Sequence, residues 1–191
     1  MKLTGENLTL ENVWAVSRGG KVELDKDARV RIKASRAYIE GQVGKGEVIY
    51  GVNTGFGAFS SVRISDADIV QLQKNLIRSH STGVGPNFSP EQTRAIMVLR
   101  ANALARGHSG IRETVIEKIL EFLNFDILPV IPQQGSVGAS GDLAPLSHLA
   151  LALIGEGEVW QDGKPADTAK VLKEKKVTPL ELQAKEGLSL I

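Results

Sequence analysis

The chain has 191 residues, of which 42% are hydrophobic, 24% charged and 5% aromatic, and its formal net charge is +1. This composition is typical of a globular protein, and scattered Lys and Arg without interleaved aromatics argue against a nucleic acid partner. The absence of Cys excludes disulfides and thiolate metal ligands, and the sequence has neither a signal peptide nor a run of about 18 apolar residues. We expect a cytoplasmic protein with no membrane partner and no metal.

The first third of the sequence predicts two helices, two short strands and a glycine-rich loop. Thr9 is a candidate N-cap for a short helix through Val16, and Asp25 begins a longer helix. That longer helix carries Val30, Ala34, Ala37, Tyr38 and Val43. Residues 22–24 and 48–50 are strand candidates, the second expected to be buried. It leads into a loop whose glycines, Gly51, Gly55 and Gly57, allow positive φ.

Four further helices and a hairpin are predicted in the rest of the chain. Ser65 is expected to cap the first of these helices, with Asp66 and Asp68 in its first turn, and its apolar stripe continues to His80. The other helix and hairpin candidates are a capping box at residues 89–92 with a helix to Gly107, a helix over 115–123, a helix over 142–153, a hairpin over 159–164, and a second capping box at 178–181.

The pattern therefore predicts a mainly α protein with a few short strands. We expect an N-terminal α+β lobe over residues 1–110, followed over 111–191 by a loop and the first helices of a long helical bundle. The chain ends in the apolar stretch 187–191, which indicates truncation at residue 191. The apolar helices over 115–123 and 146–153 are then expected to lack partners and to favour self-association.

The most informative stretch is residues 133–146, Gln-Gln-Gly-Ser-Val-Gly-Ala-Ser-Gly-Asp-Leu-Ala-Pro-Leu. It resembles the histidine, phenylalanine and tyrosine ammonia-lyases and their aminomutase relatives. The resemblance implies that Ala139, Ser140 and Gly141 condense into a methylidene-imidazolone ring, a cofactor made without any exogenous group. The residue types suit that reaction, because the Gly141 nitrogen must approach the Ala139 carbonyl closely and Ser140 must lose its β-hydroxyl as water.

Asp142 follows the triplet and opens the predicted helix, so free N–H groups and a positive dipole end would face the ring. Asp142 caps this helix or supports ring formation by moving protons, and the sequence does not separate the two roles. Without the longer match, the segment would be interpreted as a glycine-rich anion-binding nest.

Tyr50 begins the stretch Tyr-Gly-Val-Asn-Thr-Gly-Phe-Gly, which resembles the family's tyrosine loop and implies that Tyr50 is the base that removes a β-proton. A phenol has a pKa of about 10, so such a base must have its pKa lowered or be supplied as the phenolate. The alternative is a Tyr half buried at a strand end. Gly57 is counted with the substrate-binding residues, and Gly55-x-Gly57 alone is too weak to indicate a nucleotide site.

Ser79 and His80 correspond to the pair at which the subclasses differ, and Ser-His resembles the histidine lyases. A substrate-binding imidazole at His80 suits a substrate imidazole; the alternative is a core histidine with one hydrogen bond. His108 and His148 are assigned structural roles.

The resemblance implies conversion of L-histidine to urocanate and ammonia, by a homotetramer in which different subunits complete each site. A tyrosine or phenylalanine lyase, an aminomutase, or a catalytically silent folded fragment are the alternatives. Since the bundle and neighbouring subunits are not encoded here, we expect the 191 residues alone to leave the ring unformed and to be inactive.

Overall fold

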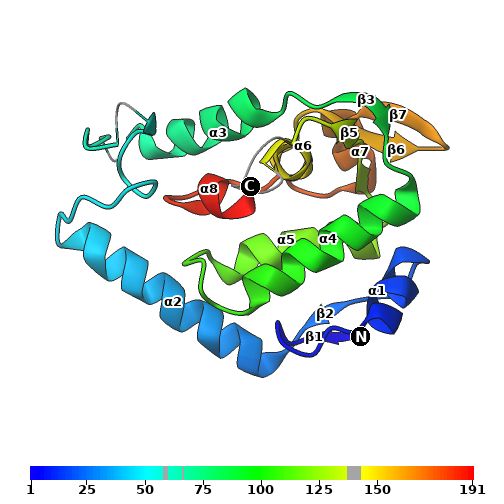
Figure 1. The fold of residues 1–191 in the computed structure, drawn as a ribbon, viewed down its shortest axis with the longest axis horizontal. Helices are drawn as coiled ribbons and strands as arrows, with labels where there is room; N and C mark the ends of the chain where they lie inside the picture. Colours follow the sequence, from blue (N-terminus) through cyan, green and yellow to red (C-terminus); the bar gives the residue numbers. More distant parts are fainter. Residues whose placement is uncertain (58–59, 66, 137–142) are drawn as a thin grey trace.

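The computed structural model describes residues 1–57, 60–65, 67–136 and 143–191. It is mainly helical, as expected (Figure 1). In chain order the elements are β1 Lys2–Leu3, α1 Leu10–Ser17, β2 Glu23–Leu24, α2 Lys26–Gly44, α3 Ile69–His80, β3 Val84–Asn87, α4 Pro90–Ala105, α5 Glu113–Asn124, β4 Leu128–Pro129, β5 Pro132–Gln134, α6 Leu143–Leu153, β6 Glu158–Gln161, β7 Lys164–Asp167, α7 Thr168–Lys175 and α8 Glu186–Leu190.

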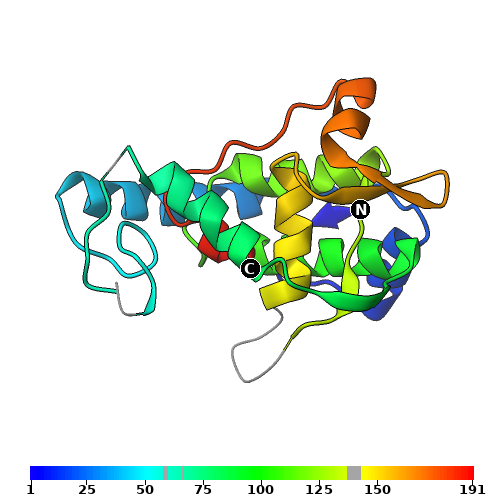
Figure 2. The same ribbon diagram turned by 90° about the horizontal axis from the view of Figure 1, so that it is seen from above.

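The helices pack in two groups around one hydrophobic core. α4 contacts α1, α2 and α5, whereas α3 contacts α6 and α8. Figure 2 shows α6 crossing between α3 and the α4–α5 pair. The core includes Ile77 of α3, Met97 of α4, Ile116 of α5 and Leu149 of α6, each fully buried. Burial of this kind is the main stabilising contribution to the fold.

Several predicted boundaries are confirmed by cap geometry. Thr9 and Ser89 each form a complete capping box at the start of α1 and α4. Asp25 caps α2 through a hydrogen bond from the Asp27 amide. The predicted hairpin is β6–β7, and Asp162 at its turn has a positive φ, which a tight hairpin turn requires.

The strands of the described residues form three small sheets. β1 pairs with β2 in parallel, β3 pairs with β5 antiparallel, and β4, β6 and β7 form an antiparallel sheet in that order. In the second sheet Val84 is opposite Gln134 and Asn87 is opposite Pro132. This pairing fixes the chain that follows α3 beside the chain that precedes α6.

Two predictions about the N-terminal half are wrong. Residues 48–50 form no strand, and Val48 and Tyr50 are 54% and 58% exposed, because the chain turns here. Helix α3 begins at Ile69 instead of beside Ser65. Its N-cap is Asp68, which makes no side-chain cap hydrogen bond, and the Ser65 hydroxyl donates to Asp68 Oδ2 (2.6 Å).

Helix α2 exposes two of the apolar residues that the sequence analysis placed on it. Val30 and Tyr38 are 67% and 66% exposed, and the helix instead buries Ala28, Ile32 and Arg36. These three residues are spaced at i, i+4 and i+8, so they form one stripe along the helix.

Two predictions about the C-terminal half are wrong as well. No helix begins at Thr178: residues 177–183 have no regular secondary structure, and the Leu180 amide donates to the Leu153 carbonyl (2.8 Å) at the end of α6. The helices over 115–123 and 146–153 do not lack partners. Their apolar residues are buried in the core of this chain, as Val115 and Leu153 illustrate with no exposed surface.

The buried carboxylate of Glu186 in α8 binds Arg112 at the start of α5. Glu186 has no exposed surface and accepts from Arg112 through Nε and Nη2 (both 2.7 Å) and from the amides of Arg112 (3.1 Å) and Gln183 (2.7 Å). Arg112 in turn donates to the Glu181 carbonyl. Four hydrogen bonds therefore satisfy a charge that would otherwise be costly to bury.

Glu186→Gln is expected to lower the free energy of unfolding by about 3 kcal/mol, because the Arg112 guanidinium loses its buried anion. Chemical denaturation of both proteins measures this. Glu181→Gln is the control: Glu181 is exposed in the same segment, so a change within about 0.5 kcal/mol is expected. Equal effects of the two substitutions would contradict the role of Glu186.

Candidate active site

The tyrosine loop after α2 is built on two buried polar side chains. Asn53 and Thr54 have no exposed surface. Asn53 accepts from the Ile49 amide (2.8 Å) and donates to the Glu47 carbonyl (2.7 Å), and Thr54 Oγ1 accepts from the Gly51 amide (3.1 Å). These bonds replace a strand ladder, since Asn and Thr bond readily to nearby backbone. The sequence analysis assigned neither residue a role, although both lie in the recognised motif.

Glycine at position 51 lets this loop pack against α8. Gly51 has φ +72°, and a Cβ there would lie 2.3 Å from Leu188 Cδ2. The Tyr50 ring beside it meets the Phe56 ring edge-on at 5.9 Å between centroids. Gly57 has no atom within 4 Å of its would-be Cβ, so the space beside it is open. The loop therefore has a fixed backbone and presents Tyr50 outward.

Ser79 and His80 form the last turn of α3. His80 Nδ1 lies 2.9 Å from the Leu76 carbonyl and 3.0 Å from Ser79 Oγ, which itself donates to the same carbonyl (2.9 Å). Because a carbonyl only accepts, the hydrogen of neutral His80 is assigned to Nδ1, and Nε2 is left as an acceptor. Ser79 is exposed and His80 half-buried, whereas Leu76 is buried. The predicted stripe thus leaves the core at its last position.

A cavity of about 160 Å³ lies at this end of α3. Three segments line it: the end of α3, the chain after β5, and the first turn of α6. The lining residues are Ser79, His80, Thr82, Gly135, Ser136, Leu143 and Ala144. The structure therefore brings His80 together with both flanks of residues 137–142.

The predicted ring residues Ala139, Ser140 and Gly141, and the adjacent Asp142, lie outside the described residues. Ser136 before the segment and Leu143 after it face the same cavity. The segment ends at the beginning of α6, where the free N–H groups of a first helical turn favour negative charge.

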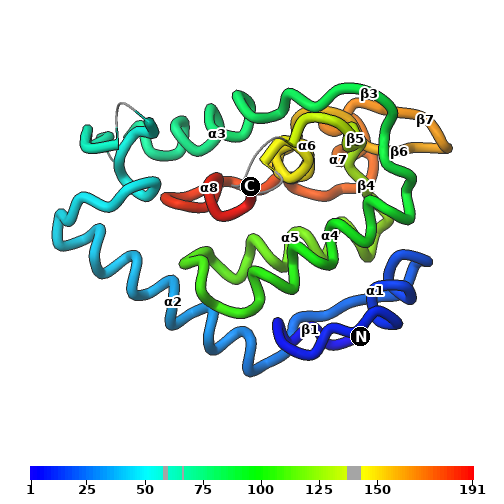
Figure 3. The backbone as a smooth tube through the Cα atoms, viewed as in Figure 1, coloured from blue at the N-terminus to red at the C-terminus, as the bar shows by residue number. Residues whose placement is uncertain are grey.

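Tyr50 and His80 are not brought together within one chain. α3 has 12 residues, which corresponds to a length of about 18 Å. His80 is its last residue, and Figure 3 shows the segment over residues 45–57 at the opposite end of the helix. The predicted site residues therefore occupy two separate places in the fold.

The two remaining histidines differ in their surroundings. His108 is exposed in the turn after α4. His148 is half-buried on α6, and its Nε2 accepts from the Gly83 amide (3.1 Å). Burial lowers the pKa of the His148 imidazole below its ordinary value. The geometry and the burial both favour a neutral side chain.

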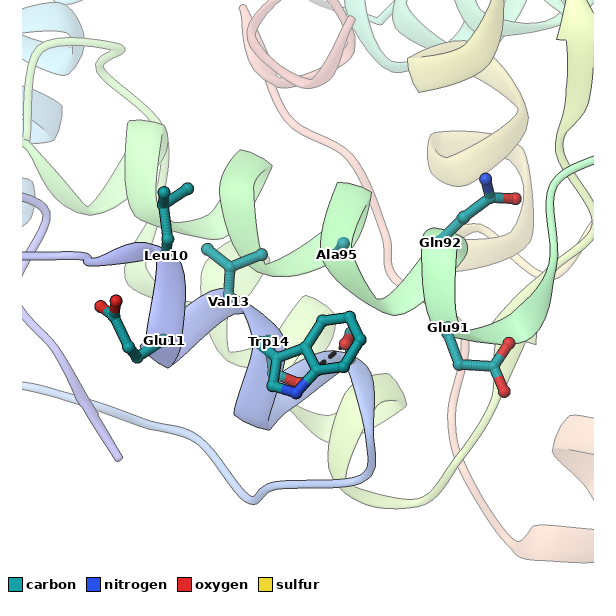
Figure 4. Close-up of a pocket in the computed structure, with 8 residues that line it drawn as sticks. Leu10, Glu11, Val13, Trp14, Glu91, Gln92 and Ala95 are labelled. Carbon is teal, nitrogen blue, oxygen red and sulfur yellow. Dashed lines mark hydrogen bonds between the residues drawn. The ribbon is translucent and has the colours of Figure 1, made fainter.

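A groove of about 550 Å³ lies between α1 and α4 (Figure 4). Its walls are mainly apolar, and Leu10 and Trp14 are 84% and 65% exposed. Ser17 at its edge donates to the Trp14 carbonyl (2.8 Å). None of the predicted site residues lines this groove. The small cavity at His80 is therefore the better candidate for chemistry.

In residues 1–57, 60–65, 67–136 and 143–191, no three His, Cys, Asp or Glu side chains are grouped as metal ligands would be. No helix in that part of the chain has the length and apolarity needed to cross a membrane.

Comparison with known proteins assigns the class. The family model for aromatic amino acid lyases matches residues 8–191, and the chain belongs to this family. It is 56% identical over 190 residues to the histidine ammonia-lyase of Shouchella clausii, covering 99% of this chain and 38% of that relative. The chain thus spans less than two fifths of that relative's length.

Solved structures agree with the class. The histidine ammonia-lyase of Trypanosoma cruzi superposes with a TM-score of 0.91 at 42% identity, over 100% of this chain and 37% of that one. The tyrosine aminomutase of Streptomyces globisporus superposes with a TM-score of 0.93 at 44% identity, over 100% and 36%. The mainly α fold predicted from the sequence is therefore confirmed.

Proposed function

We propose that the complete protein converts L-histidine to urocanate and ammonia, with a methylidene-imidazolone formed from Ala139, Ser140 and Gly141. One observation supports this most directly. Ser79 and His80 line the same cavity as both flanks of the segment that carries the triplet. Identity to histidine ammonia-lyases supports the same substrate.

His80 is proposed to bind the substrate ring. With Nδ1–H held by the Leu76 carbonyl, the free Nε2 accepts a hydrogen bond from the imidazole N–H of the substrate. Ser79 supports this tautomer, because its hydroxyl lies 3.0 Å from the same Nδ1. Gly57 is proposed to let the substrate approach the loop backbone, since no atom fills the space beside it. Asp142 is assigned to supporting ring formation.

The ring, when formed, supplies an electron-poor alkene as the electrophile of the reaction. The protein's remaining task is to remove a β-proton, which we assign to the Tyr50 oxygen. We further propose that Tyr50 of one subunit serves the cavity of another in a homotetramer. The separation of Tyr50 from His80 along α3 supports this assignment.

The 191-residue chain alone is proposed to hold residues 139–141 as three ordinary residues and not to deaminate histidine. Ring closure compresses the backbone, and such strain persists only where surrounding packing imposes it. Relatives more than twice as long supply further packing. The intact mass of the isolated chain should equal that of its sequence. A chain lighter by two water molecules would contradict this proposal.

A tyrosine or phenylalanine lyase or an aminomutase is the second candidate, favoured by the similarity to the tyrosine aminomutase. Incubation of the complete protein separately with L-histidine, L-tyrosine and L-phenylalanine distinguishes these. Urocanate from histidine supports the proposal. A β-amino acid, or a faster release of an aryl acrylate from tyrosine or phenylalanine, would overturn it.

Replacing Ser79-His80 by Phe-Leu should lower the preference for histidine over phenylalanine by about one to two decades. The reason is that a buried polar group without a partner costs about 1–3 kcal/mol. The measurement is the ratio of kcat/KM for the two amino acids. Ser81→Ala is the control, because the Ser81 hydroxyl donates to the Ile77 carbonyl (2.9 Å) and Ser81 is not among the residues that line the cavity. If the ratio of kcat/KM for histidine and phenylalanine is unchanged in the double variant, His80 has a purely structural role.

A further inference from the structure

Gly83, in the turn after α3, contacts residues on both flanks of residues 137–142. Before the segment, Gly135 has φ +142°, and its would-be Cβ lies 3.0 Å from Gly83 Cα. After the segment, His148 Nε2 accepts from the Gly83 amide (3.1 Å). The contact is close on both sides, since a Cβ on Gly83 itself would lie 3.0 Å from His148 Nε2 and 3.0 Å from Pro132 Cβ.

Helix α6 presents two residues to this turn. Ala144 and His148 are four residues apart, so they lie on one face of the helix. Ala144 Cβ lies 3.1 Å from the would-be Cβ of Gly135, and His148 contacts Gly83. α6 begins directly after residues 137–142, so its position sets where that segment ends.

We propose that His148 is a positioning residue: its hydrogen bond to the Gly83 amide holds the turn after Ser79 and His80 against α6, the helix that directly follows residues 137–142. The inference rests on the proposed function and adds a residue to it. Gly83 lies three residues after His80, and Thr82 between them lines the cavity. A shift of Gly83 relative to α6 therefore shifts the substrate-binding imidazole relative to the electrophile.

The bond defines the chemistry that position 148 requires. An amide N–H needs an acceptor, so Nε2 carries no hydrogen and the neutral imidazole has its hydrogen on Nδ1. Glutamine offers a carbonyl oxygen on a side chain of similar reach, whereas leucine fills the space without an acceptor. His148→Leu and His148→Gln thus separate the hydrogen bond from the packing.

The test uses the complete protein with its ring formed, and compares kcat/KM among the variants. His148→Leu is expected to lower kcat/KM for the substrate on the order of 10- to 100-fold, since a misplacement of about 1 Å costs that much. His148→Gln should restore most of it. His108→Leu is the control, because His108 is exposed in a turn and should be neutral. A Leu variant with the wild-type kcat/KM, or no rescue by Gln, would overturn the proposal.

A double-mutant cycle distinguishes positioning from general destabilisation. If His148 acts through His80, adding His148→Leu to a His80→Leu protein should change kcat/KM little further. Fully additive losses would overturn the proposal. Near-ultraviolet ring absorbance is expected to be retained in every variant that folds. If the wild type deaminates tyrosine instead, the histidine assignment fails, and the same comparisons with tyrosine still test His148.

A measurement without substrate tests the role of His148 independently of which amino acid the protein converts. Hydrogen exchange of the peptide containing the Gly83 amide should be faster in His148→Leu and close to wild type in His148→Gln. Gly83→Ala, which crowds the same contact, should also speed exchange of this peptide. Equal exchange in the wild type and the Leu variant would overturn the proposal whatever the protein's substrate.

Discussion

Ser140→Ala in the complete protein is expected to abolish deamination of histidine. The substitution removes the β-hydroxyl whose loss as water creates the exocyclic methylene of the ring. Only one oxygen atom is removed, so the fold should remain intact. Urocanate formation and the near-ultraviolet absorbance of the ring should therefore vanish together.

Ser136→Ala provides the comparison for this result. Ser136 lies in the same stretch and lines the cavity, but the resemblance gives its hydroxyl no part in ring closure. Its variant should retain ring absorbance, whatever happens to its kcat. Wild-type turnover by Ser140→Ala, or loss of ring absorbance only in Ser136→Ala, would contradict the assignment of the triplet.

Tyr50→Phe should lower kcat by about 10²- to 10⁴-fold, the contribution typical of a general base. In the described part of the structure the Tyr50 hydroxyl has no hydrogen-bond partner, and the ring contact with Phe56 does not need it. Stability should therefore change by less than about 0.5 kcal/mol. Tyr38→Phe is a matched control, since Tyr38 is the only other Tyr and is similarly exposed on α2.

Mixing subunits tests whether Tyr50 acts across a subunit interface. Protein reassembled from a mixture of Tyr50→Phe and Ser140→Ala subunits should regain activity if the proposed oligomer forms, because some cavities then combine an intact Tyr50 with an intact triplet from another chain. If both groups act within one chain, every subunit in the mixture stays defective. Mixtures no more active than either parent would contradict the shared site. A Tyr50→Phe protein that retains more than a third of the wild-type kcat would show that Tyr50 is not the base.

The sequence predicted most helices because their signals are local. Capping boxes at Thr9 and Ser89 and the apolar period of α5 depend only on neighbouring residues. The errors arose where tertiary contacts override local pattern. The segment after Thr178 forms no helix, and its Leu180 amide donates to the Leu153 carbonyl at the end of α6.

The candidate site was predicted in part, and for a similar reason. His80 and the ring-forming stretch could be found from their motifs, because each is a short run of chemically distinctive residues. The link through Gly83 and His148 joins positions 65 residues apart, and no local pattern indicates such a contact. Tyr50 was recognised in its motif, but its distance from His80 depends on how the loop packs against α8.

We propose that residues 139–141 of the complete protein mature into the electrophile of a histidine-deaminating enzyme. The most direct measurement is the mass of the proteolytic peptide that spans these residues, taken from protein that releases urocanate from L-histidine. A peptide lighter than its sequence by two water molecules is expected. A peptide of unmodified mass from a fully active preparation would contradict it.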